Sequence, residues 1–216
     1  MVGDLSHVCN RGIAKGKIFL GDDYYLRFVE GLYRFNNLSG AIRVSDGHNI
    51  FTDLPAQEKL VDIFKWSLMP NHYHLFLYEQ VDGGITEFVK RVGNGFTKYF
   101  NIRNERSGYL FQNAAKIVSV TTDKHFLYLP FYIDLNPVEL FEPRWEETGV
   151  KNVKKVMDFL ISYRWSSYAD YAGRRNFPWI INKGLFYRLF DTNEVRYQQE
   201  IVEWLKNYPV LSNLPC

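Results

Sequence analysis

Cysteine is scarce in this chain of 216 residues, which contains only Cys9 and Cys216. Two cysteines cannot form a disulfide framework or a cysteine-rich zinc site, so the disulfide-stabilised secreted scaffolds are excluded. Long apolar runs are missing too, since none approaches the ~20 residues that span a bilayer. The first residues, MVGDLSHVCNRG, lack the basic start and apolar block of a secretion signal. We expect a cytoplasmic protein without a membrane partner.

The chain also lacks a strong excess of charge of either sign. Its formal net charge is only +2, which is too small to indicate nucleic-acid binding from composition. Aromatic residues, in contrast, are abundant, with 17 Phe, 15 Tyr and 5 Trp. Such rings fill a core or stack on unpaired bases. With 46% hydrophobic and 23% charged residues, the composition is typical of a folded protein.

Apolar periodicity and turn formers predict the elements of the first two thirds of the chain. Strands are expected at residues 5–11 and 116–120, and a β-hairpin over residues 61–79 that turns at Pro70 and Asn71. Amphipathic helices are expected at residues 22–35, with Asp22 or Asp23 as the cap, 85–105, and 122–136, with Thr122 or Asp123 as the cap. Pro130 interrupts the last of these helices, and residues 39–60 are interpreted as a connection.

The order strand, helix, strand, strand, helix, strand, helix predicts an α+β fold, with a ferredoxin-like antiparallel sheet and packed helices. We expect the core to occupy residues 1–142 and a helical extension to occupy residues 143–216. The extension is predicted to contain three helices, within VKKVMDFLISYRWSSYADYAG, INKGLFYRLF and NEVRYQQEIVEWLKNY. Trp165, in the first of these segments, is expected to pack the extension against the core.

The stretch WSLMPNHYHLFLYEQ, residues 66–80, places two histidines inside an apolar and aromatic run. Because side chains alternate along a strand, His72 and His74 point to the same face. Such a pair can bind one divalent cation or donate hydrogen bonds to a phosphate. It can equally be two partly buried histidines that neighbouring carbonyls satisfy, and the spacing alone does not choose between these hypotheses.

In the later stretch FYIDLNPVE, Tyr132 and Asn136 are four residues apart. On a helix they lie about 40° apart, so that one face presents a phenol and an amide. Alternatively, Tyr132 packs in the core and Asn136 only ends the helix before Pro137. The spacing taken alone favours this second interpretation.

Five segments taken together resemble a known family. In chain order they are HVCNRG, LMPNHYHLFL, GYLFQ, YIDLNPVE and YRWSSYADYAG. Their order and intervals, over most of the chain, are similar to those of the REP-associated tyrosine transposases, a branch of the single-tyrosine HUH transposases. The resemblance implies a ferredoxin-like core with Tyr132 as the nucleophile. It also implies that His72, His74 and Asn136 bind Mg²⁺ or Mn²⁺.

The resemblance further implies a metal-dependent endonuclease and strand transferase, acting on single-stranded DNA next to hairpin repeats. The reaction would pass through a 5′-phosphotyrosine and a free 3′-hydroxyl, and rejoining would need no ATP. A free phenol has a pKa near 10, so only ~0.1% is ionised at pH 7 and a neighbouring cation favours the phenolate. Whether the protein acts as a monomer or a homodimer, and whether Tyr132 serves its own subunit, stays open.

Basic residues near the first strand and on the helix after the hairpin are candidates for contact with DNA phosphates. They are Arg11, Lys15, Lys17, Lys90, Arg91 and Lys98. The chain departs from the family at one point: after GYLFQ, members usually continue with Gly-Arg-aromatic-Lys, whereas this chain has Asn113, Ala114, Ala115 and Lys116. An arginine that would contact DNA is therefore missing.

Three alternative hypotheses are weaker. The first is a non-catalytic protein, derived from a transposase, that only binds single-stranded DNA hairpins. Residues 113–115, which differ from the usual family residues, are compatible with this hypothesis. The presence of all four expected site residues, His72, His74, Tyr132 and Asn136, argues against it. The second is a phosphoesterase with paired His-x-Thr/Ser motifs, of which the chain has none. The third is a structural metal site, which usually needs four Cys or His ligands. The remaining candidates offer no convincing spacing: His7, His48, His125, Cys9 and Cys216.

Overall fold

The computed structural model describes residues 1–42 and 57–207. Its antiparallel sheet has the strand order β2-β3-β1-β4. The strands are β1 (Leu5–Arg11), β2 (Val61–Met69), β3 (His72–Glu79) and β4 (Lys116–Ser119). These bounds confirm the predicted strands and hairpin. Of the predicted connection, residues 43–56 lie outside the described residues.

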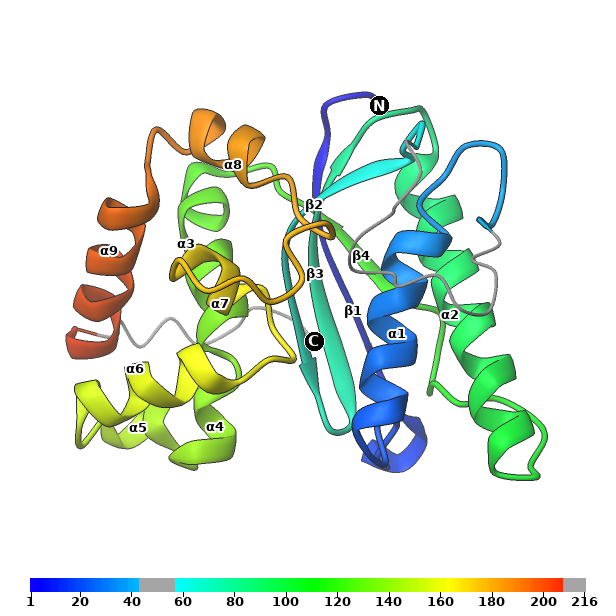
Figure 1. Cartoon of the computed structure of the whole chain (residues 1–216), viewed down its shortest axis with the longest axis horizontal. Helices are drawn as coiled ribbons and strands as arrows, with labels where there is room; N and C mark the ends of the chain where they lie inside the picture. The colour runs from blue at the N-terminus through cyan, green and yellow to red at the C-terminus, as the bar shows by residue number, and fades with distance from the viewer. Residues whose placement is uncertain (43–56, 208–216) are drawn as a thin grey trace.

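Helices cover both faces of this sheet (Figure 1). On one face lie α1 (Asp22–Arg34) and α2 (Gly84–Arg103), and on the other lies α3 (Asp123–Leu135). The chain order β1-α1-β2-β3-α2-β4-α3 and the strand order confirm the predicted ferredoxin-like α+β fold.

Two helix starts differ in how they are capped. α1 follows Gly21, so Asp22 and Asp23 lie in the first turn rather than at the cap; carboxylates there interact favourably with the partial positive charge of the helix N-terminus. The cap of α3 is Thr122, whose side chain accepts a hydrogen bond from the backbone N–H of His125. Pro130 lies within α3 without ending it.

The two faces of the sheet differ in chemistry. Val8, Tyr73 and Leu75 face the first pair of helices, and Tyr73 packs on Phe28 of α1 with ring centroids 4.8 Å apart. Because side chains alternate along each strand, the histidines of β1 and β3 face α3. The apolar face therefore forms a core, and the opposite face carries a polar layer under α3.

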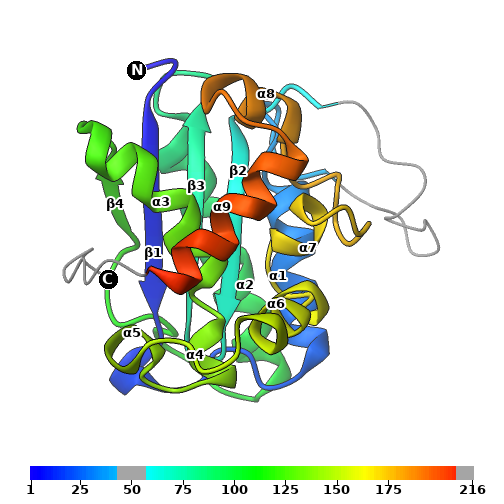
Figure 2. The ribbon, with the colours of Figure 1, turned by 90° about the vertical axis from the view of Figure 1, so that its left-hand side faces the viewer.

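The C-terminal part of the chain packs over α3. It contains α4 (Val138–Phe141), α5 (Trp145–Thr148), α6 (Val153–Ser162), α7 (Tyr168–Tyr171), α8 (Lys183–Leu189) and α9 (Glu194–Lys206). Figure 2 shows α9 crossing in front of α3, and the ring of Trp204 stacks on Phe131 of α3 with centroids 4.7 Å apart. Buried residues of the core and the extension form one hydrophobic cluster; the boundary at residue 142 stays a prediction.

The first helix predicted in the extension is shorter than expected. α6 ends at Ser162, and the next residues run beside β2, where Leu68 N donates to Trp165 O and Ser167 N donates to Trp66 O, both at 2.9 Å. The unpaired backbone groups of a sheet edge compete with helix formation, and this segment satisfies them. Trp165 is 7% exposed and stacks on Tyr25 at 4.8 Å, which confirms its predicted packing role.

Within the described residues, no helix combines the length and the apolar character that a membrane crossing requires.

Candidate functional site

The pairing of β1 with β3 creates a row of functional side chains on the face under α3. Cys9 pairs with His74 and Arg11 pairs with His72, and directly paired residues point to the same face. The amide oxygen of Asn71 accepts a hydrogen bond of 2.7 Å from Nδ1 of His72. An imidazole that donates through Nδ1 keeps a lone pair on Nε2 when it is neutral, so His72 can offer Nε2 to a ligand.

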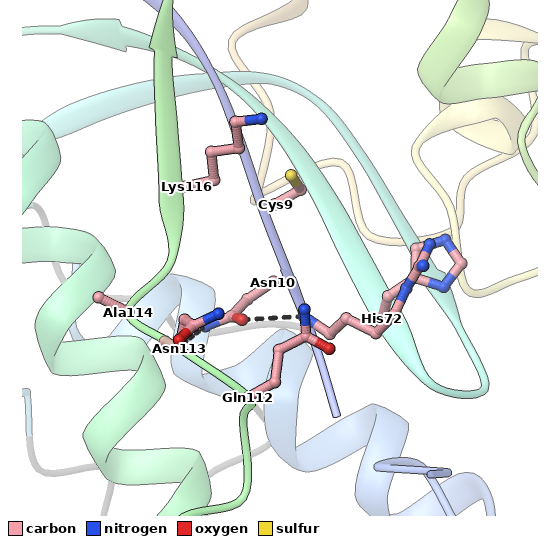
Figure 3. Close-up of a pocket in the computed structure, with 8 residues that line it drawn as sticks. Cys9, Asn10, His72, Gln112, Asn113, Ala114 and Lys116 are labelled. Carbon is pink, nitrogen blue, oxygen red and sulfur yellow. Dashed lines mark hydrogen bonds between the residues drawn. The ribbon is translucent and has the colours of Figure 1, made fainter. Parts of the chain in front are cut away.

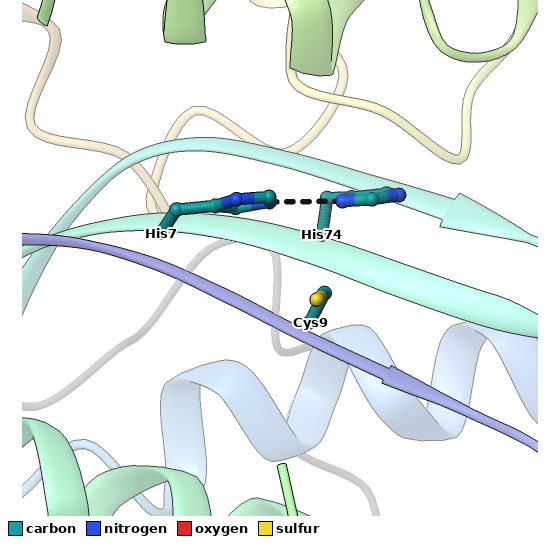
Figure 4. Close-up of side chains that lie close together, drawn as sticks. All are labelled: His7, Cys9 and His74. Carbon is teal, nitrogen blue, oxygen red and sulfur yellow. Dashed lines mark hydrogen bonds between the residues drawn. The ribbon is translucent and has the colours of Figure 1, made fainter. Parts of the chain in front are cut away.

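His74 is oriented by a third histidine, His7 of β1 (Figure 4). Nε2 of His7 lies 2.9 Å from Nδ1 of His74, and the ring planes differ by 12°. The other nitrogen of His74, Nε2, is buried and has no hydrogen-bond partner among the described residues. Buried polar atoms are nearly always paired, so this nitrogen is a candidate ligand atom.

His7, Cys9 and His74 have potential ligand atoms within 4.8 Å of one another. His7 was set aside as a metal ligand because its spacing to the other candidates is not convincing, although strand alternation already places it on the same face as Cys9 and Arg11.

Helix α3 brings a phenol and an amide to the same place. The Tyr132 ring lies 5.3 Å from the His74 ring and 5.9 Å from the His7 ring, as centroid distances. Asn136, which ends α3, lies beside His72, and its Oδ1 is buried without a hydrogen-bond partner in the described part of the chain. His72, His74, Tyr132 and Asn136 therefore meet within one chain.

Burial keeps the imidazoles of this cluster neutral. It lowers the pKa of His72 to about 4, with a further lowering by the Arg11 cation and an opposing effect of the Asn136 amide. Burial also lowers the pKa of His7 to about 3 and that of His74 well below its usual value. Neutral rings at pH 7 have the lone pairs that metal binding requires.

The pKa of the Tyr132 phenol is raised, whereas the pKa values of the histidines are lowered. Burial, and next the Glu146 carboxylate, raise its pKa to about 12, whereas the Arg11 cation opposes this. The phenol is therefore protonated at neutral pH and is a weak nucleophile without a further positive charge nearby.

The donor atoms fit a divalent metal ion. His72 and His74 supply imidazole nitrogens and Asn136 supplies an amide oxygen, and the two buried atoms without partners, His74 Nε2 and Asn136 Oδ1, belong to this set. Nitrogen and oxygen donors of this kind suit several divalent ions, so the set does not specify which metal binds.

A pocket of about 400 Å³ opens beside His72 (Figure 3). It is lined by Arg11 of β1 and by Gln112, Asn113 and Lys116. Residues 113–114, where the sequence differs from the motif it otherwise resembles, thus lie next to His72. Arg11 is half-buried and lowers the pKa of both histidines and of Tyr132, so its charge acts on the whole cluster.

The other predicted DNA contacts lie farther out. Lys15 and Lys17 are exposed in the segment after β1, and Lys90 and Lys98 are exposed on α2. Arg91 forms an ion pair with Glu87 at 2.8 Å and donates to the backbone oxygen of Asn37 at 2.7 Å, so its guanidinium already has partners within the chain. DNA contact by these residues stays a prediction.

A buried ion pair behind the site was not anticipated. Nζ of Lys65 lies 2.8 Å from Oδ2 of Asp134, and both side chains are 0% exposed. The same Oδ2 accepts a hydrogen bond of 2.8 Å from the Tyr197 hydroxyl, and Oδ1 accepts one of 3.2 Å from Ser167. Nζ also lies 3.1 Å from the ring centroid of Tyr171. Asp134 follows Tyr132 by two residues, so this network fixes the helix that carries the phenol.

No protein-family model matches the sequence, and no curated protein matches it. Among solved structures, the chain is similar to a REP-associated tyrosine transposase bound to a REP hairpin. The similarity covers 82% of each chain with a TM-score of 0.50 and 13% sequence identity. At this identity the comparison shows a shared fold.

Proposed function

We propose that this protein is a metal-dependent endonuclease and strand transferase of the tyrosine transposase type. Its substrate would be single-stranded DNA next to hairpin repeats. The observation that carries the proposal is the meeting of Tyr132 with His74, 5.3 Å apart between ring centroids, beside His72 and Asn136 in the same chain. The shared fold with a hairpin-bound transposase supports it.

In this proposal, the Tyr132 oxygen attacks the phosphorus of the scissile phosphodiester. A bond forms between the phenolic oxygen and the phosphorus, the bond from the phosphorus to the 3′ oxygen breaks, and the phenolic proton is passed on so that the leaving strand ends in a 3′-hydroxyl. The 5′-phosphotyrosine keeps the energy of the broken bond. Attack by another 3′-hydroxyl reverses these steps and joins the strands.

His72, His74 and Asn136 would hold the metal ion, with Mg²⁺ or Mn²⁺ as our candidates. The ion, when bound, neutralises charge on the non-bridging phosphate oxygens and favours the phenolate of a nearby tyrosine. Arg11 acts in the same direction, since its charge lowers the pKa of Tyr132. Burial raises that pKa to about 12, so the phenol depends on these neighbours to react at neutral pH.

The proposal is tested by trapping the covalent intermediate. The protein is incubated with Mn²⁺ and 3′-labelled hairpin oligonucleotides carrying single-stranded flanks, because a 5′-phosphotyrosine retains the 3′ part of the strand, and adducts are separated under denaturing conditions. We expect a labelled adduct with the wild type and none with Tyr132→Phe. Tyr128→Phe is the matched control, because that ring stacks on Tyr132 at 5.7 Å from one helical turn away; it should still form the adduct.

A band shifted in a native gel, with no adduct under denaturing conditions for any hairpin tried, would favour the non-catalytic DNA-binding alternative. An adduct that persists in Tyr132→Phe would remove the assignment of this tyrosine.

A further inference from the structure

A second hollow, of about 640 Å³, lies between helix α2 and the segment that leads into β4. Val89 and Gly93 of α2 line one side, and Phe111 and Ala115 line the other, with Tyr73 also among the lining residues. Its volume falls in the range of about 300–1,000 Å³ that is usual for small-molecule sites. We call this hollow the α2 groove.

The α2 groove exists because small residues line it. Ala114, Ala115 and Gly93 contribute little or no side chain, and a Cβ added to Gly93 would meet no atom within 4 Å. Glycine inside a helix is destabilising relative to alanine, and nothing packed against Gly93 requires its small size. The space above Gly93 is therefore open, and a larger side chain at this position would extend into the groove.

The α2 groove is continuous with the pocket beside His72. Asn10, Gln112, Asn113 and Ala114 line both hollows, and Figure 3 shows Gln112 and Asn113 between His72 and Ala114. The connecting segment is held in place, because Nδ2 of Asn10 donates to the backbone oxygen of Asn113 at 3.1 Å. A ligand with one part at His72 can thus place its next part in the groove.

The chemistry of the α2 groove suits a flat ring with polar edges. Its apolar walls carry the amides of Asn94, Gln112 and Asn113, which both donate and accept hydrogen bonds. Tyr109 also lines it and is 83% exposed, so its ring is available for stacking. Lys90 is exposed where the groove meets α2, which places a cation near a phosphate backbone.

We propose that the α2 groove binds an unpaired nucleobase of the DNA strand whose scissile phosphate lies at the His72 pocket. This inference rests on the proposed function for its ligand, single-stranded DNA. Stacking on Tyr109 and the apolar walls supplies affinity, and the amides contact the edges of the base.

The test compares normal and abasic strands. Affinities of poly(dT), poly(dA) and poly(dC) oligonucleotides, and of an abasic strand of equal length, are measured by fluorescence anisotropy without metal, so that no cleavage occurs. We expect the wild type to prefer at least one base-bearing strand over the abasic strand by about tenfold, which corresponds to one base stacked on an aromatic ring. Gly93→Leu, which fills the groove, and Tyr109→Ala should reduce this preference and leave the affinity for the abasic strand unchanged.

Gly184→Leu, on helix α8, is the matched control, since its Cβ meets only the end of Arg188 at 3.8 Å; it should behave like the wild type. Equal binding of normal and abasic strands by the wild type, or an unchanged preference in Gly93→Leu, would overturn the inference. The binding experiment and the adduct experiment can fail separately. If Gly93→Leu loses the base preference, the inference about the groove is supported even when Tyr132 forms no adduct. If an adduct forms but the wild type shows no base preference, only the proposed function is supported.

Discussion

At the residue scale, the hydrogen bond between His7 and His74 decides which nitrogen of His74 can bind a ligand. If Nδ1 of His74 donates to Nε2 of His7, which lies 2.9 Å away, the neutral His74 ring keeps its lone pair on the buried Nε2. Partners of this kind fix the tautomer and the orientation of a metal-binding histidine. His7 would then act on the site through His74.

If His7 orients His74, removing His7 should weaken metal binding although all three proposed metal ligands remain. His7→Ala should weaken Mn²⁺ binding, measured by isothermal titration calorimetry, by about 10- to 100-fold, as is usual when such a partner is removed. His125→Ala is the control, because the His125 ring lies 6.5 Å from the His7 ring without a hydrogen bond to His74. Thermal melts of both variants establish that they fold. Equal affinities of His7→Ala and the wild type would contradict the role.

At the element scale, α3 carries both the candidate nucleophile and one partner of a buried ion pair. Asp134 accepts hydrogen bonds from Lys65, Tyr197 and Ser167. These partners come from β2, from α9 and from the residue before α7. One carboxylate thus connects the helix of Tyr132 to the sheet and to the extension.

Removing one partner of the Lys65–Asp134 ion pair should lower the stability of the fold. Asp134→Asn leaves the Lys65 ammonium buried without a carboxylate, and we expect the free energy of unfolding in urea to fall by roughly 3–5 kcal/mol. The double variant Lys65→Met with Asp134→Leu should recover most of this loss, since an apolar pair of similar volume is often neutral.

An exposed ion pair provides the comparison for this experiment. Arg144 and Glu147 lie 2.6 Å apart and are 72% and 65% exposed, so Arg144→Ala should change the unfolding free energy by less than about 1 kcal/mol. A similar, small effect of Asp134→Asn would show that the buried network does not hold α3.

At the scale of the whole molecule, the candidate site is complete within one chain. His72 and His74 come from β3, and Tyr132 and Asn136 come from α3 of the same chain and its C-terminal cap. Extension helices pack over α3, as Figure 2 shows. We therefore predict that Tyr132 serves the histidines of its own chain, whether the protein is a monomer or a homodimer.

A mixing experiment tests this expectation. Tyr132→Phe and His74→Ala should each form no adduct, and a mixture of the two should form none, because neither chain has both groups. Adduct formation in the mixture, measured with the same labelled hairpin strands, would instead require a tyrosine of one chain to reach the histidines of another. Mixing wild type with either variant controls for inhibition by the inactive chain.

The sequence predicted more of the elements than of the contacts between them. Alternation along a strand put His72 and His74 on one face, and helical spacing put Tyr132 near Asn136, since both inferences need only local geometry. The pairing of His7 with His74 depends on the register of β1 against β3. Lys65 and Asp134 meet across 69 positions, which no local pattern encodes. The roles of these residues in catalysis and metal binding stay predictions.

By itself, the sequence determined the order of strands and helices, because periodicity and turn residues act over a few positions. Only the tertiary structure decided how these elements meet. Residues 163–167 are not helical, although their sequence predicted a helix, because they form hydrogen bonds with the edge of β2. The small residues at 93, 114 and 115 form a groove only because α2 packs beside the segment before β4. Both outcomes depend on groups that are distant in the chain and become neighbours on folding.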